Sequence, residues 1–151
     1  MGTTQICEAN CLLFMEDKEM STFILEVITP GRSFFSGEAE CVIFRSVDGE
    51  MGVLAKHAPT VTTVDVGPLK IKTDGKWIEA VVTSGFAKIM PDKVVIMADT
   101  AEYPEEIDVN RAKAAKQRAE EKLQKQLSQL EYMRSKAALA RAMARIKATS
   151  K

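Results

Sequence analysis

Residues 69–82 read LKIKTDGKWIEAVV, and this stretch contains the pattern on which the expected fold of most of the chain rests. Apolar and polar residues alternate over 69–72, as in a strand with one buried face. Asp74-Gly75 follows, a dipeptide that favours a tight hairpin turn, and 77–82 is a second run rich in β-branched and aromatic side chains. The stretch therefore predicts a β-hairpin.

Similar runs continue on both sides of this hairpin. Gly, Pro or Asp turn signals bound most of the further predicted strands, at residues 23–28, 41–44, 51–54, 86–90 and 94–97. Short strands with turn signals every 8–12 residues or so are typical of a sandwich or a flattened barrel, here a β domain of roughly 80 residues at 21–100. Strand–helix alternation and a phosphate-binding G-x-x-x-x-G-K-[ST] loop are both missing from the sequence, so a Rossmann or P-loop architecture is not expected.

The character of the chain changes after a linker at residues 101–106. Residues 107–151 contain neither Gly nor Pro and are rich in strong helix formers. Asp108 is a good N-cap, and the three- and four-residue spacing of apolar positions over 112–130 predicts a helix with one buried face. Residues 128–131, SQLE, are typical of a capping box, which predicts that the first helix ends near Ser128 and a second begins there. The apolar face expected for the second helix is Leu139, Ala142, Met143 and Ile146.

The two parts differ in charge. Residues 1–106 carry 9 Lys and Arg against 17 Asp and Glu, a net charge of −8, whereas residues 107–151 carry 12 against 4, a net charge of +8. A basic helical hairpin attracts anionic partners, such as nucleic acid, a nucleotide or an acidic protein loop. Its apolar face is made mostly of Ala and Leu, so we expect it to be only marginally stable by itself.

The amino-terminal arm shows no periodic pattern over residues 1–20. Met15 and Met20 both precede plausible starts, so we expect this arm to be disordered or a spurious extension. It lacks the features of a signal peptide, and no apolar run approaches the ~20 residues that span a bilayer. Cys7, Cys11 and Cys41 lack paired zinc spacing and are expected to be reduced thiols, which fits the cytosol.

Two kinds of side chain are candidates for chemistry. The single histidine, His57, stands before a turn proline and is expected to be structural, and local spacing suggests no catalytic set. The tail arginines are more informative: Arg111 and Arg118 share one helical face, and so do Arg141 and Arg145. If the chain reverses near Ser128, Arg111 comes to lie beside Arg145. Such a cluster suits an anion such as phosphate, although four solvated arginines on the outside of the hairpin would show the same pattern.

Three segments carry a resemblance to a known family. They are GEMGVL at 49–54 followed by His57-Ala58-Pro59, VTSGF at 82–86 followed by PDKV at 91–94, and IDVNRA at 107–112. In this order and spacing, from about Thr22 to the C-terminus, they resemble the epsilon subunit of bacterial F-type ATP synthase. Ala55-Lys56 replaces the Pro-Gly usual before the histidine, and Ser84 replaces the first glycine of G-G-F.

The resemblance implies an α+β fold, with an N-terminal ten-stranded β-sandwich followed by an antiparallel two-helix hairpin. It implies a non-catalytic rotor subunit of the central stalk that couples proton flow to ATP synthesis. The partners so implied are the gamma subunit, the ring of c subunits and the alpha–beta catalytic head. The chain would lie at the cytoplasmic face of the bacterial cell membrane, attached only through the complex and without a required cofactor or metal.

The resemblance also implies regulation by the tail. The extended tail would block ATP hydrolysis, and ATP would favour the folded hairpin by neutralising its arginines. The ATP-binding positions that it implies are Glu102, Ile107, Asp108, Arg111, Ala112, Arg118, Arg141 and Arg145.

Two other functions compete with this interpretation. A nucleic-acid-binding module could use the +8 tail, but the tail has no aromatic interleaving beyond Tyr132, and Glu120 and Glu121 interrupt its basic face. A free-standing ATPase is the weakest candidate, because the sequence has no Walker lysine loop and no evident Mg²⁺-ligating set.

Overall fold

A computed structural model describes residues 21–125 and 128–150. These residues form two compact units: a β unit that ends at Ala101 and a helical unit that begins at Glu102. The predictions made for residues 1–20, including Cys7 and Cys11, lie outside the described residues.

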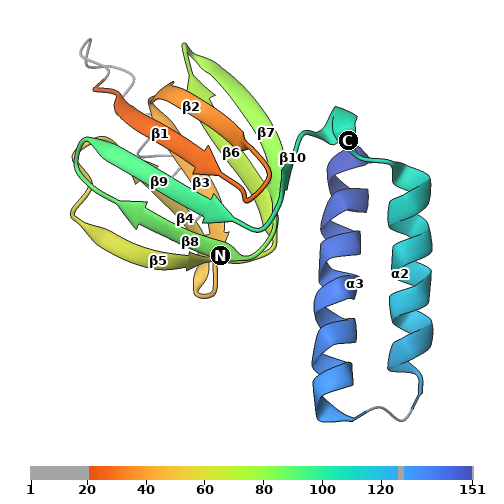
Figure 1. The fold of residues 1–151 in the computed structure, drawn as a ribbon. Coiled ribbons are helices and arrows are strands. Elements are labelled where there is room, and N and C mark those ends of the chain that lie inside the picture. Colours follow the sequence, from red (N-terminus) through yellow and green to blue (C-terminus); the bar gives the residue numbers. More distant parts are fainter. Residues whose placement is uncertain (1–20, 126–127, 151) are drawn as a thin grey trace. The chain divides into compact units, whose positions relative to one another are not determined.

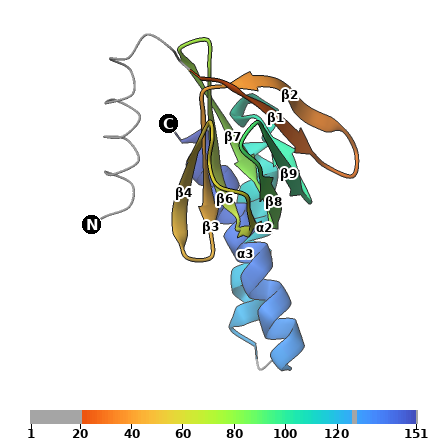
Figure 2. The same ribbon diagram turned by 90° about the vertical axis from the view of Figure 1, so that its left-hand side faces the viewer.

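Ten strands make up the β unit and its border with the helical unit. They are β1 Phe23–Ile28, β2 Ser33–Ala39, β3 Cys41–Ser46, β4 Gly49–Leu54, β5 Thr60–Val64, β6 Gly67–Thr73, β7 Lys76–Val82, β8 Gly85–Ile89, β9 Lys93–Ala98 and β10 Ala101–Glu102. One sheet has the order β2-β1-β9-β8-β5 and the other β10-β7-β6-β3-β4 (Figures 1 and 2). The two separate sheets confirm the ten-stranded sandwich and exclude the flattened barrel.

The hairpin predicted at residues 69–82 is present. Strands β6 and β7 are antiparallel, with Ile71 opposite Ile78. Asp74 and Gly75 have φ angles of 50° and 73°, the left-handed pair that a tight hairpin turn requires. The register aims Leu69 and Ile71 into the core, where both are fully buried. Turn chemistry and hydrophobic alternation therefore act together here.

The sandwich core is filled from both sheets by side chains that alternate along each strand. In β1, Phe23, Leu25 and Val27 are buried, while the residues between them are exposed or half-buried. Phe44 of β3 is the largest fully buried side chain. The Cys41 side chain is also buried. This two-residue period explains why these strands could be predicted from the sequence.

Two caps and a one-turn 3₁₀ helix organise the helical unit. After η1, Pro104–Glu106, come α2, Val109–Leu123, and α3, Gln129–Thr149, which run side by side in Figures 1 and 2. Asp108 caps α2 by accepting from the Arg111 amide at 3.1 Å, and Ser128 and Glu131 form the predicted capping box of α3. No described helix is long and apolar enough to cross a membrane.

The first helix ends at Leu123, earlier than the predicted end near Ser128. The physical reason is that two antiparallel helices need several residues of non-helical chain to reverse direction. Helix α2 has its C-cap at Gln124, and α3 begins at Gln129 after the Ser128 cap.

A narrow seam of small residues joins α2 to α3. Its buried members are Ala112 and Ala119 in α2, and Ser135 and Ala142 in α3. Within each helix the two are seven residues apart, the period of a coiled-coil contact. Leu130 and Met143, which the sequence pattern assigns to buried faces, are 61% and 52% exposed. A seam this narrow buries Ala142 and leaves the next residue, turned by about 100° around the helix, in solvent.

Candidate functional site

All eight positions expected to bind ATP lie in the unit that begins at Glu102. The order along the chain is Glu102 in β10, Ile107 and Asp108 before α2, Arg111, Ala112 and Arg118 in α2, and Arg141 and Arg145 in α3.

The I-D-x-x-R-A motif builds the start of α2. Ile107 is buried directly after η1, and Asp108 in extended conformation caps the helix. Ala112 is buried in the seam. Three of the four motif residues thus have structural roles, while Arg111 is exposed on the first turn and free to meet a ligand.

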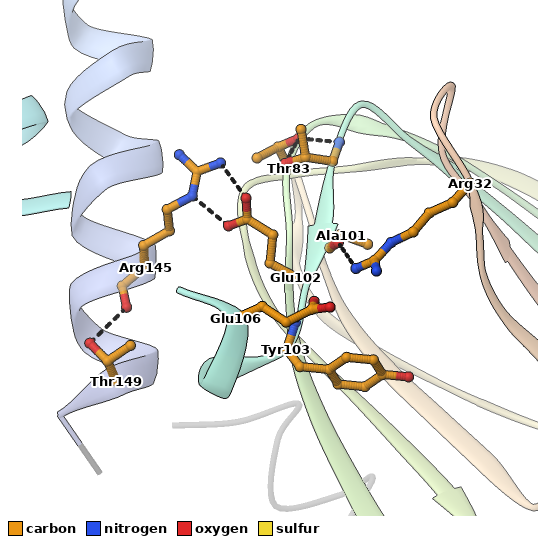
Figure 3. Close-up of polar contacts among 9 residues, drawn as sticks. Arg32, Thr83, Ala101, Glu102, Tyr103, Glu106, Arg145 and Thr149 are labelled. Atoms are coloured by element: carbon orange, nitrogen blue, oxygen red, sulfur yellow. Dashed lines mark hydrogen bonds and ion pairs between the residues drawn. The ribbon is translucent and has the colours of Figure 1, made fainter. Parts of the chain in front are cut away.

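Glu102 and Arg145 form the best-aligned ion pair of the helical unit. Arg145 donates from Nε to Oε2 at 2.7 Å and from Nη2 to Oε1 at 3.3 Å, the bidentate fork that guanidinium and carboxylate favour (Figure 3). The two side chains, arginine and glutamate, are 27% and 32% exposed, so solvent screens the pair and its net contribution is about 1 kcal/mol or less. Glu102 is therefore the carboxylate that pairs with Arg145 in this structure.

Further hydrogen bonds stabilise the backbone near both members of the Glu102–Arg145 ion pair. Thr149 Oγ1 donates to the carbonyl of Arg145 at 3.2 Å. The Glu106 carboxylate accepts from the Tyr103 amide at 3.0 Å and so stabilises the turn that follows Glu102. In the β unit, the carbonyl of Ala101 accepts from Arg32 Nη2 at 3.3 Å. The backbone on both sides of Glu102 is thus tied down.

The other arginines are not neutralised in this way. Arg118 Nε donates to the carbonyl of Ala114 at 3.4 Å, and Arg118 is one of the residues that line a cavity of about 300 Å³ between the helices. Arg141 is half-buried and makes neither a hydrogen bond nor an ion pair with another described side chain. The placement of Arg111 beside Arg145 with an anion among the arginines remains a prediction; the observed anion at Arg145 is Glu102.

Arg134 lines the same cavity as Arg118 and is not identified by the sequence pattern. A reversal at Ser128 matches Arg111 with Arg145. Counting from the observed helix ends gives a different match, since Arg118 lies five residues before the end of α2 and Arg134 five residues after the start of α3. A sequence-based prediction that placed the end of α2 earlier, with a longer connecting loop, would have matched Arg118 with Arg134.

The structure also describes the surroundings of His57 and the distribution of side chains that could bind a metal. His57 lies between β4 and β5, and its Nδ1 is 2.8 Å from the carbonyl of the next residue, Ala58; its structural role stays a prediction. Among residues 21–125 and 128–150, no cluster of three His, Cys, Asp or Glu side chains could hold a metal ion.

Comparisons with known proteins agree with the two-part structure. The family described as "ATP synthase, Delta/Epsilon chain, beta-sandwich domain" matches residues 22–104. The family described as "ATP synthase, Delta/Epsilon chain, long alpha-helix domain" matches residues 105–150.

Bacterial relatives are similar over most of their length. The chain is 81% identical over 132 residues to the ATP synthase epsilon chain of Ruminiclostridium cellulolyticum, covering 87% of this chain and 98% of the relative. It is 48% identical over 128 residues to the ATP synthase epsilon chain of Caldicellulosiruptor saccharolyticus, covering 85% and 93%.

Solved structures share the fold. A chain in the Euglena gracilis mitochondrial ATP synthase (OSCP/F1/c-ring) superposes with a TM-score of 0.74 at 25% identity, over 93% of each chain. A chain from the central stalk and c-ring of Tetrahymena thermophila mitochondrial ATP synthase superposes with a TM-score of 0.60 at 14% identity, over 85% of this chain and 97% of that chain, and supports the fold alone. The chain therefore belongs to the delta/epsilon chain family of ATP synthase, as a non-catalytic epsilon subunit.

Proposed function

We propose that this chain is a rotor subunit of the central stalk of a proton-translocating F-type ATP synthase, where it couples proton flow to ATP synthesis. We further propose that its C-terminal helices inhibit ATP hydrolysis and that ATP favours the folded hairpin. Its partners are then the gamma subunit, the c ring and the alpha–beta head, at the cytoplasmic face of the cell membrane. The family membership and the similarity to a chain from an F1/c-ring assembly support this assignment.

The alanine seam is the observation that carries the regulatory part. Helices of 15 and 21 residues fully bury only two residues each, and three of these four are alanines, whereas the larger Leu123, Leu139 and Ile146 are only half-buried. Burying a methyl group stabilises by less than about 1 kcal/mol. A hairpin held by so little apolar surface has a small free energy of folding, which a ligand or a partner can shift in either direction.

The charges of the helical unit support ATP as that ligand. Arg145 forms an ion pair with the Glu102 carboxylate. Arg111, Arg118 and Arg141 form no ion pair with any other described residue. ATP would bring several negative charges to these arginines. A ligand present at 100 times its dissociation constant stabilises the state that binds it by about 2.7 kcal/mol, enough to redistribute a marginal hairpin between two forms.

Truncation tests the inhibitory part. A chain that ends after Ala101 keeps the β unit and removes the helices. The assembled ATP synthase with this truncated chain is expected to hydrolyse ATP faster than the wild-type complex, measured as phosphate release. Equal incorporation of the truncated chain, checked on gels of the purified complex, is the control. Unchanged hydrolysis in a fully incorporated complex would contradict inhibition by the tail.

Calorimetry tests the ATP site. Arg111→Ala and Arg141→Ala are expected to weaken ATP binding to the isolated chain about tenfold or more, since each removes a charge-assisted hydrogen bond. Lys113→Ala is the matched control, because Lys113 is an exposed cation of α2 outside the predicted site. Equal heats from wild type and the two arginine variants would exclude this ATP site, and an equal loss in Lys113→Ala would indicate a general charge effect instead.

One face of the sandwich supports its place in an assembly. In the β2-β1-β9-β8-β5 sheet, Met97 stands opposite both Ile28 and Phe86. These three side chains, which we call the apolar row, are 39–57% exposed and cross three neighbouring strands. A contiguous exposed apolar surface is typical of a protein–protein contact. We propose that the apolar row meets another subunit of the stalk.

A further inference from the structure

Three cationic side chains meet around a hollow between α2 and α3. The cavity of about 300 Å³ is lined by Arg118 and Lys122 from α2, by Arg134 and Ser135 from α3, and otherwise by alanines. Two buried residues of the seam, Ala119 and Ser135, also line this hollow, so the hollow lies along the seam between the helices. Small side chains on the floor leave space that the long basic side chains border.

No acidic side chain of the described chain neutralises these cations. The nearby carboxylates are engaged elsewhere: Glu120 pairs with Lys116, Glu121 accepts from Gln117, and Glu131 closes the capping box at Ser128. By contrast, Arg145 of the same helical unit has its own carboxylate in Glu102. The three side chains are exposed, so solvent screens their mutual repulsion, but an anion that enters the hollow meets three positive charges at once.

The floor adds a neutral donor. Ser135 is only 7% exposed, lines the cavity, and its hydroxyl has no hydrogen-bond partner among the described residues. Arginine presents a planar fork to oxyanions, lysine a compact charge, and serine an O–H donor. Together they match an anion with several acceptor oxygens better than a single carboxylate.

We infer that the pocket formed by Arg118, Lys122, Arg134 and Ser135 binds a phosphate-type oxyanion. Its volume lies at the lower end of small-molecule sites, which range from about 300 to 1,000 Å³, and suits a di- or triphosphate group rather than a large organic ligand. Of the four pocket residues, only Arg118 is among the eight positions expected to bind ATP. Pyrophosphate binding here does not require that ATP regulates the hairpin.

Pyrophosphate is the probe, titrated into the full-length chain in magnesium-free buffer by calorimetry. Arg134→Gln is expected to weaken binding about tenfold, through loss of one charge-assisted fork. Lys136→Gln is the matched control: it removes the same charge from an exposed position of α3 that does not line the cavity, and it should bind like wild type. In NMR spectra the amide of Ser135 should shift with pyrophosphate in wild type. Unchanged helical circular dichroism establishes that Arg134→Gln is folded.

Two results would overturn the inference: wild-type affinity for pyrophosphate in Arg134→Gln, or an equal loss of affinity in Arg134→Gln and Lys136→Gln.

A competition experiment distinguishes the two sources of the anion, a nucleotide and a free anion. If ATP displaces pyrophosphate and adenosine does not, the pocket takes the phosphate chain of a nucleotide; if ATP and pyrophosphate bind together, it takes a free anion. Both results support the pocket. Arg111→Ala separates the two proposals, because it should weaken ATP binding through the motif and leave pyrophosphate binding intact.

Discussion

Gly85 and Ser84 of the V-T-S-G-F segment differ in how much space surrounds their side chains. A Cβ built at Gly85 would collide with the carbonyl oxygen of Met97 and lie 2.8 Å from Ala98 Cα, because β8 and β9 pair at this point. Ser84, where the family usually has glycine, is exposed, and its Oγ donates to Asp99 at 3.3 Å. The departure at Ser84 therefore fits the fold without strain.

Gly85→Ala is expected to lower the free energy of unfolding by about 1–3 kcal/mol, the usual cost of forcing an extra methyl into close packing. Urea denaturation of the full chain measures it. Gly31→Ala is the matched control, since no atom lies within 4 Å of a Cβ there. Similar midpoints for the two variants would show that the strand contact at Gly85 relaxes.

Lys72 and Glu40 show the limit of interpreting single residues. The alternation of β6 suggests an exposed lysine at 72, yet Lys72 is 6% exposed and its Nζ lies 3.3 Å from Glu40 Oε2. Glu40 Oε1 also accepts from the Gly75 amide at 3.0 Å, which ties the β6–β7 turn to the residue between β2 and β3. Only the pairing of distant strands reveals this partner, so the sequence pattern could not.

At the level of elements, strands with a clear apolar period were predictable and the others were not. The residue pattern does not reveal β2, β5 and β10, which only the family resemblance supplies. In β5 the one buried side chain is Val64, while Val61 is 70% exposed. β2 reads SFFSGEA and β10 has two residues. These strands are held by hydrogen bonds to neighbours, and their own side chains give little signal.

The start of α3 gives a test at the element scale. Ser128 Oγ accepts from the Glu131 amide, and the Glu131 carboxylate accepts from the Ser128 amide. Ser128→Ala should cost about 1 kcal/mol of helix stability and reduce hydrogen-exchange protection in the first turns of α3. Ser150→Ala, at the opposite end of the helix, should leave those amides unchanged. Undiminished protection in Ser128→Ala would mean that the seam alone holds the start of α3.

At the scale of the whole molecule, the apolar row predicts how the chain enters its complex. Phe86→Glu should weaken its co-purification with the other stalk subunits severalfold, because a charge replaces the most exposed member of the row, at 57%. Val47→Glu is the control, since Val47 is a 74% exposed apolar residue in the turn between β3 and β4. Normal assembly of Phe86→Glu, or an equal defect in Val47→Glu, would place the interface elsewhere.

Features that depend on near neighbours in the chain could be predicted from the amino-acid order alone. Alternation along strands, the Asp74-Gly75 turn and the caps at Asp108 and Ser128 each involve residues a few positions apart, and all are present in the structure. The division into an acidic β part and a basic helical part is also visible in composition alone.

Contacts between distant residues emerge only in the folded chain. Strand β1 lies parallel to β9, Glu102 pairs with Arg145, and Arg118 shares a cavity with Arg134 instead of being matched through a turn at Ser128. Such pairings depend on where each helix ends and on which small residues form the seam. A shift of a few residues in the loop changes every partner across the hairpin, and no local pattern in the sequence encodes that shift.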